Sequence, residues 1–351
     1  MRALTHDDRG AVAVFVALVL TVLLGVGAIV IDIGALYQER REVQNGADAA
    51  ALEAAGLCAE GNTCPADVED AAEAIAGANA GDTTSEVLEV CASAGVTGVP
   101  PCSGPGVELY GYTPPAAPAG AKWVRVTVGT RTSGGGNEIS YRLAQFLDVV
   151  EDGKQVRASS TAAWGPVGGA TTIPLTFSVC EYDEATASNP IQTGPPFTGA
   201  PTYIYFHGSE PAGSCPAGPS GGDLPGGFGW LDSNGCQAAI EAGGWVDDET
   251  GVAVPNGCDP TTWQDKTVLL PIYDQTNGLT GSNGEYHIAG FAGFHITGYK
   301  LSGNGWPSGF NCPEQPGGSG RCIRGYFTTI TTSGEIGSGA DFGAVVVDLI
   351  G

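Results

Sequence analysis

The chain has 351 residues, including 56 glycines and 23 prolines, and its 14 basic and 38 acidic residues give a net charge of −24 at pH 7. Nucleic-acid binding depends on Lys and Arg displacing counterions from phosphates, so a surface this acidic excludes nucleic acid as a partner. Ten cysteines in such a chain indicate disulfides formed in an oxidising compartment.

An uncharged apolar run extends from Ala11 to Ile31. As a helix rising about 1.5 Å per residue it would span roughly 30 Å, the hydrocarbon thickness of a bilayer. A cleaved secretory signal is the alternative, but its apolar stretch has only about 7–15 residues and ends at a small-x-small site. We therefore expect a cytoplasmic tail at residues 1–10 and a retained transmembrane helix at residues 11–31.

The orientation of this helix does not follow from charge, because Arg2 and Arg9 before the run are balanced by Arg40 and Arg41 after it. All ten cysteines, however, lie beyond the run. Disulfides form outside the cytoplasm. We therefore expect a single-pass protein of the cell membrane with a cytoplasmic N-terminus and an extracytoplasmic bulk.

The helical pattern continues past the membrane. Read in heptads, one face is apolar except for Arg40, with the positions Ile33, Leu36, Arg40, Val43, Ala47, Ala50, Ala54 and Leu57. This face can pack on the protein's own domain or against further copies of the chain, and small alanines permit close approach in either case. We favour the first packing and keep an oligomer through the helix at residues 33–57 as the alternative.

These residues resemble the N-terminal segment of the TadE/TadG-type proteins of tight-adherence (Tad, or Flp) pilus assembly. Arg9 and Gly10 match before the helix, and Asp32 and Gly34 match at its end. The family's alanine-rich stretch corresponds to Val43–Leu52, with Gln44, Asn45, Ala47, Asp48, Ala49, Ala50 and Ala51. The chain departs from the family at Gly46, where the family usually has Ala.

The resemblance also distinguishes between kinds of pilus protein. Prepilins are cleaved after a Gly and carry Glu at the fifth mature position, which counted from Gly10 is Phe15 here. The resemblance therefore implies an uncleaved accessory or structural protein, whose partners are membrane lipid and other pilus or secretion assembly proteins. Several short segments further along the chain, such as Gly229–Asp232, look similar to segments in the C-terminal region of actinobacterial TadG-like proteins.

Residues 32–164 have the pattern of a pilin-like helix-plus-strands module. A helix is expected at residues 66–80, and strict alternation over Lys122–Val128 predicts a strand with three valines on one face. Residues 139–147 have helical spacing, and residues 155–164 form the next strand. The glycine-rich residues 165–170 are expected to be a linker.

Residues 171–351 contain short apolar runs bounded by turn residues, which predicts a mainly β, sandwich-like extracellular domain braced by disulfides. The fold class is therefore α+β. The expected strands are Ile173–Cys180, Thr202–Phe206, Thr267–Tyr273, Tyr286–Tyr299, Arg324–Thr332 and Ala344–Ile350. The run with His287 and His295 is either one long strand or a hairpin turning at Ala292–Gly293.

The cysteines divide evenly about the expected linker, with Cys58, Cys64, Cys91 and Cys102 before it and Cys180, Cys215, Cys236, Cys258, Cys312 and Cys322 after it. Each part can therefore close its own bridges. Near neighbours are the preferred pairs: Cys58 with Cys64, Cys91 with Cys102, and Cys312 with Cys322.

No catalytic set is evident. Gly218–Gly222 matches Gly-x-Ser-x-Gly around Ser220, but it lies in a Pro/Gly-rich loop instead of a strand-to-helix turn. His207, His287 and His295 could hold zinc only in a hairpin, and ordinary half-buried histidines explain them better.

Calcium is the stronger candidate ion, because three acidic loops carry oxygen ligands. These loops are Asp232–Gly235, Asp247–Glu249 and Asn256–Asp259. None has the complete spacing of a calcium loop. We expect no enzyme activity and no cofactor, with calcium left open. The alternative to an assembly protein is a membrane-anchored adhesin or wall-acting enzyme unrelated to pili.

Overall fold

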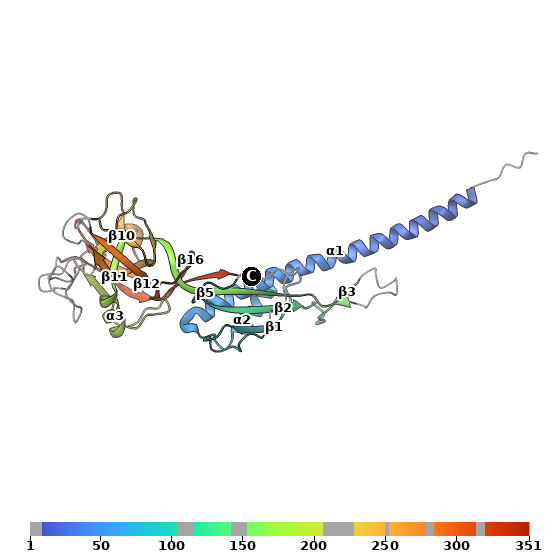
Figure 1. Ribbon diagram of the computed structural model, residues 1–351, viewed down its shortest axis with the longest axis horizontal. Coiled ribbons are helices and arrows are strands. Elements are labelled where there is room, and N and C mark those ends of the chain that lie inside the picture. The colour runs from blue at the N-terminus through green and yellow to red at the C-terminus, as the bar shows by residue number, and fades with distance from the viewer. Residues whose placement is uncertain are drawn as a thin grey trace, which may run out of the picture.

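The computed structural model describes residues 9–103, 116–141, 153–205, 228–249, 253–277, 284–313 and 320–350. A long helix, α1 (Arg9–Ala59), projects from a module at the middle of the molecule, and a β-rich body lies at the far end (Figure 1). The α+β organisation, a long apolar helix followed mainly by strands, is confirmed.

Helix α1 has 51 residues and is therefore about 75 Å long. The apolar side chains of its first half are exposed, from Val12 at 59% to Ile33 at 60%. Its second half buries Val43 and the five alanines Ala47, Ala50, Ala51, Ala54 and Ala55. Among the described residues α1 is the one helix long and apolar enough to cross a membrane, which fits a membrane anchor.

The buried half of α1 and helix α2 (Val68–Ala78) pack on a sheet with the strand order β1 (Ser85–Ala92), β2 (Lys122–Thr130), β5 (Arg157–Thr172), β18 (Ala344–Leu349) and β15 (Ile330–Thr332). Val124, Val126 and Val128 of β2 are fully buried in one cluster with the alanines of α1. The alternation predicted for this strand is confirmed, because its period of two directs every valine toward the helix.

Residues 165–170 differ from the expected linker, since they lie inside β5. The first part of β5 pairs with β2 and β18, and its later part pairs with β9 (Ala238–Glu241) and β16 (Glu335–Ile336). The glycines here serve close approach of strands: a Cβ on Gly168 would lie 2.8 Å from the Cα of Gly337. The module and the outer body thus share β5, and the chain returns to the module through β18.

The outer body is built on a nine-stranded sheet. Its main order is β7 (Thr202–Tyr205), β14 (Cys322–Thr328), β12 (Glu285–Leu301), β11 (Thr267–Asn277), β6 (Leu175–Ser178) and β8 (Phe228–Trp230). Strands β10 (Trp245–Asp247), β13 (Asn304–Trp306) and β17 (Ala340–Asp341) also pair with β12. Strand β12 is continuous over 17 residues, so of the two arrangements left open by the sequence it adopts the single long strand.

Three local elements differ from expectation or were not foreseen. Ile139 and Ser140 form β3, which pairs with β4 (Gly153–Lys154). The spacing over residues 139–147 predicts a helix, so this strand differs from the expectation. Residues 142–147 lie outside the described residues. The strand expected to reach Cys180 ends at Ser178, where α3 (Val179–Ser188) begins. The Ser178 hydroxyl accepts a hydrogen bond from the Glu181 amide at 3.2 Å, a helix-starting cap. A short 3-10 helix, η3 (Pro260–Trp263), follows β10.

Disulfides join near neighbours in both bodies. Cys58 pairs with Cys64 and Cys91 with Cys102 in the module, and Cys236 pairs with Cys258 and Cys312 with Cys322 in the outer body. These bridges include all three pairs preferred from the sequence. Cys180 is also disulfide-bonded, and Cys215 lies outside the described residues.

Candidate functional site

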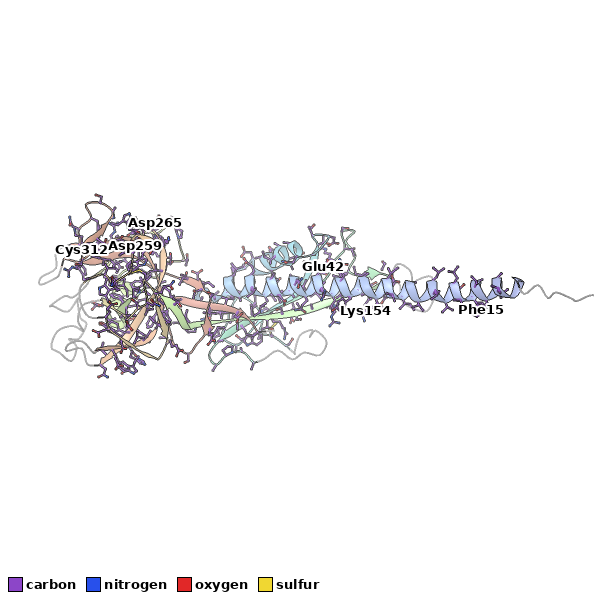
Figure 2. All side chains as sticks on the ribbon, turned by 90° about the horizontal axis from the view of Figure 1, so that it is seen from above. Phe15, Glu42, Lys154, Asp259, Asp265 and Cys312 are labelled. Carbon is purple, nitrogen blue, oxygen red and sulfur yellow. A yellow bond between two sulfur atoms is a disulfide. The ribbon has the colours of Figure 1, made fainter. Side chains whose placement is uncertain are left out.

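The candidate site is the docking region of α1, where the helix changes from exposed to buried (Figure 2). Phe15 lies on the projecting part and is 67% exposed, whereas Glu42 lies at the start of the module. The Glu42 carboxylate accepts hydrogen bonds from the Gln38 side chain at 3.0 Å and from the Gly81 amide at 2.8 Å. The bond from Gly81 ties the helix to the loop after α2, and the bond from Gln38, one turn earlier on α1, holds the Glu42 side chain in place.

The family-motif residues divide along the helix by environment. Arg9 and Gly10 begin α1. Asp32 is buried, at 5% exposure, between the exposed side chains of Ile31 and Ile33. Gly34 has open space beside it, since apart from the adjoining backbone of α1 no described atom lies within 4 Å of where its Cβ would be.

The alanine-rich stretch of the motif faces the protein itself. Ala47, Ala50 and Ala51 are fully buried against the module, whereas Asn45 is exposed and Ala49 is half-buried. The Gln44 amide donates a hydrogen bond to the Asp48 carboxylate one turn later, at 2.8 Å. In the structure the apolar face of this helix therefore packs on the protein's own domain, which is the arrangement favoured from the sequence.

Gly46 has a structural reason to differ from the family's alanine. A Cβ at this position would lie 3.2 Å from the carbonyl oxygen of Ala76 in α2 and 3.6 Å from its Cβ. The missing side chain lets the two helices approach closely. The loss of helix propensity, about 1 kcal/mol for a Gly in a helix interior, is offset by this contact.

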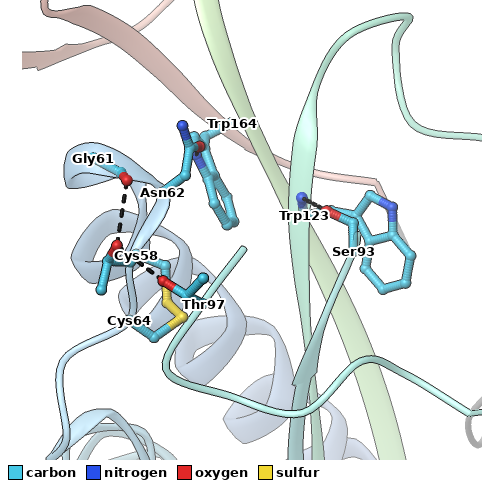
Figure 3. Close-up of a disulfide and its surroundings, with 9 residues drawn as sticks. Cys58, Gly61, Asn62, Cys64, Ser93, Thr97, Trp123 and Trp164 are labelled. Carbon is cyan, nitrogen blue, oxygen red and sulfur yellow. Dashed lines mark hydrogen bonds between the residues drawn. A yellow bond between two sulfur atoms is a disulfide. The ribbon is translucent and has the colours of Figure 1, made fainter. Parts of the chain in front are cut away.

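The end of α1 is fastened to the sheet by a turn that was not expected from the sequence (Figure 3). After α1 the short helix η1 (Glu60–Asn62) brings Asn62 to φ 54°, and its side-chain oxygen accepts a hydrogen bond from the Trp164 indole at 3.0 Å. Beside it, the Cys58–Cys64 bridge closes the turn, and the Cys64 amide donates to the Thr97 carbonyl at 2.8 Å. The Glu-Gly-Asn sequence signals a turn, but nothing local signals its partner 102 residues away.

The histidines considered for zinc have separate partners. His287 contacts the Asp274 carboxylate and packs near Trp245, with ring centroids 5.2 Å apart. His295 lies 3.3 Å from the Asp265 carboxylate and stacks on Phe197 at 4.5 Å. Both lie on the single strand β12, eight positions apart, and do not share one ion. His207 and Ser220 lie outside the described residues.

The acidic loops that could bind calcium instead make hydrogen bonds within turns and between neighbouring loops. Asp259 accepts a hydrogen bond from the Thr261 amide at 3.0 Å, and hydrogen bonds from the Thr261 hydroxyl and amide lower the pKa of this carboxyl. Asp248 likewise accepts from the Gly284 amide at 2.9 Å, and the Asp232 amide donates to the Asp247 carbonyl. In the described part of the chain, no three His, Cys, Asp or Glu side chains are placed to share a metal ion.

Comparison with known proteins agrees with this location of the site. The family model described as putative Flp pilus-assembly TadE/G-like, called Tad, matches residues 10–57. No curated protein and no solved structure matches the chain. The matched segment spans both the exposed apolar half of α1 and the half buried on the module. The similarity to the TadE/G-like Flp pilus-assembly family therefore lies in residues 10–57, the segment that forms nearly all of α1.

Proposed function

We propose that this protein is a single-pass, membrane-anchored accessory or structural component of Flp (Tad) pilus assembly that presents an extracytoplasmic interaction domain. The observation that carries the proposal is the division of one continuous helix. The Tad match ends at residue 57, two residues before α1 ends at Ala59, and so covers nearly all of the buried half. The family segment therefore combines a membrane anchor with a helix half that packs on the module and attaches the rest of the chain to the anchor.

The cysteines support an extracytoplasmic position for the bulk of the protein. Each body contains closed bridges: two in the module and, among cysteines that both lie in the described ranges, two in the outer body, where Cys180 is disulfide-bonded as well. Such bridges persist in oxidising compartments and are rare in the cytoplasm. The N-terminus is then cytoplasmic, and the partners of the outer body are other pilus or secretion assembly proteins.

The packing of α1 on the module restricts how copies of the chain could associate. Ala47, Ala50 and Ala54 are occupied within the chain, so an oligomer through residues 33–57 would use the exposed face of the helix. That face includes Ile33 at 60% and Tyr37 at 48% exposure. Oligomerisation through this face is a proposal of its own, which crosslinking at Tyr37→Cys would test.

The function is tested by deleting the gene in a strain that makes Tad pili. Surface pili should be lost or reduced while the pilin itself is still produced, and the wild-type gene should restore them. A matched variant with residues 1–31 exchanged for a cleavable secretory signal should be secreted and should not restore pili. Normal pili in the deletion strain would contradict the assembly role, and full rescue by the secreted form would contradict the need for the anchor.

The topology is tested separately. Full-length protein should stay with membranes after carbonate washing, and protease added outside the cell should digest the chain beyond about residue 57, where the family match ends. Protection of the module from external protease would reverse the proposed orientation.

A further inference from the structure

An open groove lies where β5 passes from the module into the outer body. Its volume is about 850 Å³. Gly168–Thr171 of β5 form the middle of the lining, and β9 and β16 flank them on the two sides. Figure 1 shows this region beside the label of β16, between the two bodies.

Two carboxylates face each other across this groove. Glu241 of β9 and Glu335 of β16 both pair with Gly169, one on each side of β5, and both line the groove. Two strand spacings separate their Cα atoms, which is about 10 Å. Between them Gly169 has no side chain, and the Glu241 Cγ lies 3.7 Å from where its Cβ would be.

Nothing in the described structure neutralises these carboxylates. Both residues are exposed, and neither carboxylate has a hydrogen bond or ion pair with any residue in the described ranges. No Lys or Arg is among the lining residues. The groove therefore presents uncompensated negative charge at a fixed spacing on a rigid sheet.

An aromatic side chain completes the lining. Trp245 lies at the end of the groove and is 46% exposed, although tryptophan usually buries its ring. The ring is held beside His287, which is in turn bonded to Asp274. Ile336 and Ala242 add further apolar surface. An exposed indole close to carboxylates is an arrangement that attracts organic cations.

We propose that this groove binds a Lys or Arg side chain of a partner protein, with the cation between Glu241 and Glu335 and the aliphatic stem against Trp245. Lys and Arg pair an apolar stem with a charged head, which matches this lining. Calcium fits less well, because it takes 6–8 oxygen ligands and two carboxylates supply too few.

The test uses the full-length chain in nanodiscs of neutral phosphatidylcholine. The probe is the fluorescently labelled, end-blocked peptide Thr-Val-Lys-Val-Thr, compared with the same peptide carrying Gln in place of Lys, at physiological ionic strength. We expect the Lys peptide to bind about three- to tenfold more tightly than the Gln peptide, since ion pairs with exposed carboxylates each contribute modestly. Glu241→Gln and Glu335→Gln should each remove most of this difference.

Two matched variants separate local binding from general attraction to an acidic protein. Glu53→Gln makes the same charge change at an exposed position of α1 outside the groove, and should leave binding unchanged. Gly169→Val keeps both carboxylates but fills the space between them. Its Cβ would meet its nearest neighbour at an ordinary 3.5 Å, so the strand should accept it while peptide binding is lost.

Thermal melting of each variant checks that the sheet remains folded. An equal effect of Glu53→Gln and Glu241→Gln would overturn the proposal, because binding would then follow net charge alone. Equal binding of the Gln peptide would also overturn it. Two further results would also overturn it. If cellotetraose bound more tightly than the Lys peptide and this binding were lost in Trp245→Phe, the groove would be a sugar site. If calcium ions alone bound more tightly than the Lys peptide and this binding were lost in Glu335→Gln, it would be a metal site.

Discussion

The hydrogen bond between Trp164 and Asn62 should contribute measurably to the attachment of α1 to its sheet. Trp164 is 2% exposed in β5, and its indole donates to the Asn62 side chain at 3.0 Å. Trp164→Phe retains most of the ring but removes the donor. The Asn62 oxygen then loses its partner in the half-buried turn after α1.

The expected loss has two parts. A partly buried acceptor left without a partner costs about 1 kcal/mol or somewhat more. The smaller ring removes roughly 40 Å² of apolar contact, about 1 kcal/mol at 25 cal/mol per Å². The free energy of unfolding should therefore fall by about 2 kcal/mol, which lowers the melting temperature by about 4–8 °C for a domain of this size.

A double-mutant cycle isolates the hydrogen bond. Asn62→Gly removes the acceptor, and glycine adopts the positive φ of 54° without steric cost. Pulse proteolysis of the full chain in urea should give a coupling of about 1 kcal/mol between Trp164→Phe and Asn62→Gly. Trp123→Phe is the control and should show no coupling, because its indole has no hydrogen bond to a described residue. A coupling near zero for Trp164 would refute the reasoning.

Three further outcomes are expected. Ala50→Glu buries a carboxylate at a fully enclosed position, so it should destabilise the module by several kcal/mol in the same proteolysis assay; unchanged stability would mean that the helix does not dock there. Replacing the Cys58–Cys64 bridge by serines should lower the free energy of unfolding by about 2 kcal/mol, and replacing Cys236–Cys258 should lower it by about 3 kcal/mol. The second loss is larger because the sequence separations are 6 and 22, and a bridge that closes a longer loop restricts the unfolded chain more. The opposite order would contradict this explanation. The hydrogen bonds to Asp259 depress its pKa in the folded state, so their stabilising effect should be present above the ordinary value of 3.8 and be lost as the pH falls through the lower folded value. Carbon NMR titration should show this pKa rising toward 3.8 in Thr261→Val, and no change would exclude the hydroxyl as the cause.

The elements that could be predicted are those whose signal is local and periodic. The uncharged length of residues 11–31 predicts a long apolar helix, and alternation at Val124, Val126 and Val128 predicts both a strand and its buried face. The cap at Ser178 also has a local signal, because Ser-x-x-Glu spans the start of α3, but the apolar run before it favours a longer strand.

The parts that could not be predicted depend on contacts between distant segments. Gly168 and Gly169 indicate a linker by composition, yet tertiary pairing with β9 and β16 keeps them in a strand. The acidic groove has the same origin, since Glu241 and Glu335 meet across Gly169 only after the chain has crossed and returned. No spacing in the sequence predicts that juxtaposition.

The shared strand β5 determines how the protein would carry tension. Figure 1 shows β5 running lengthwise between the helix side and the outer body. The return strand β18 lies antiparallel beside it, with pairs from Pro166–Val345 to Ala162–Leu349. A pull on the outer body away from the membrane draws β5 and β18 in the same direction. It therefore loads in shear the hydrogen bonds between β5 and its other neighbour, β2, which run perpendicular to the strand axis. Peeling would break them one at a time, so this arrangement gives a resilient connection between anchor and outer body.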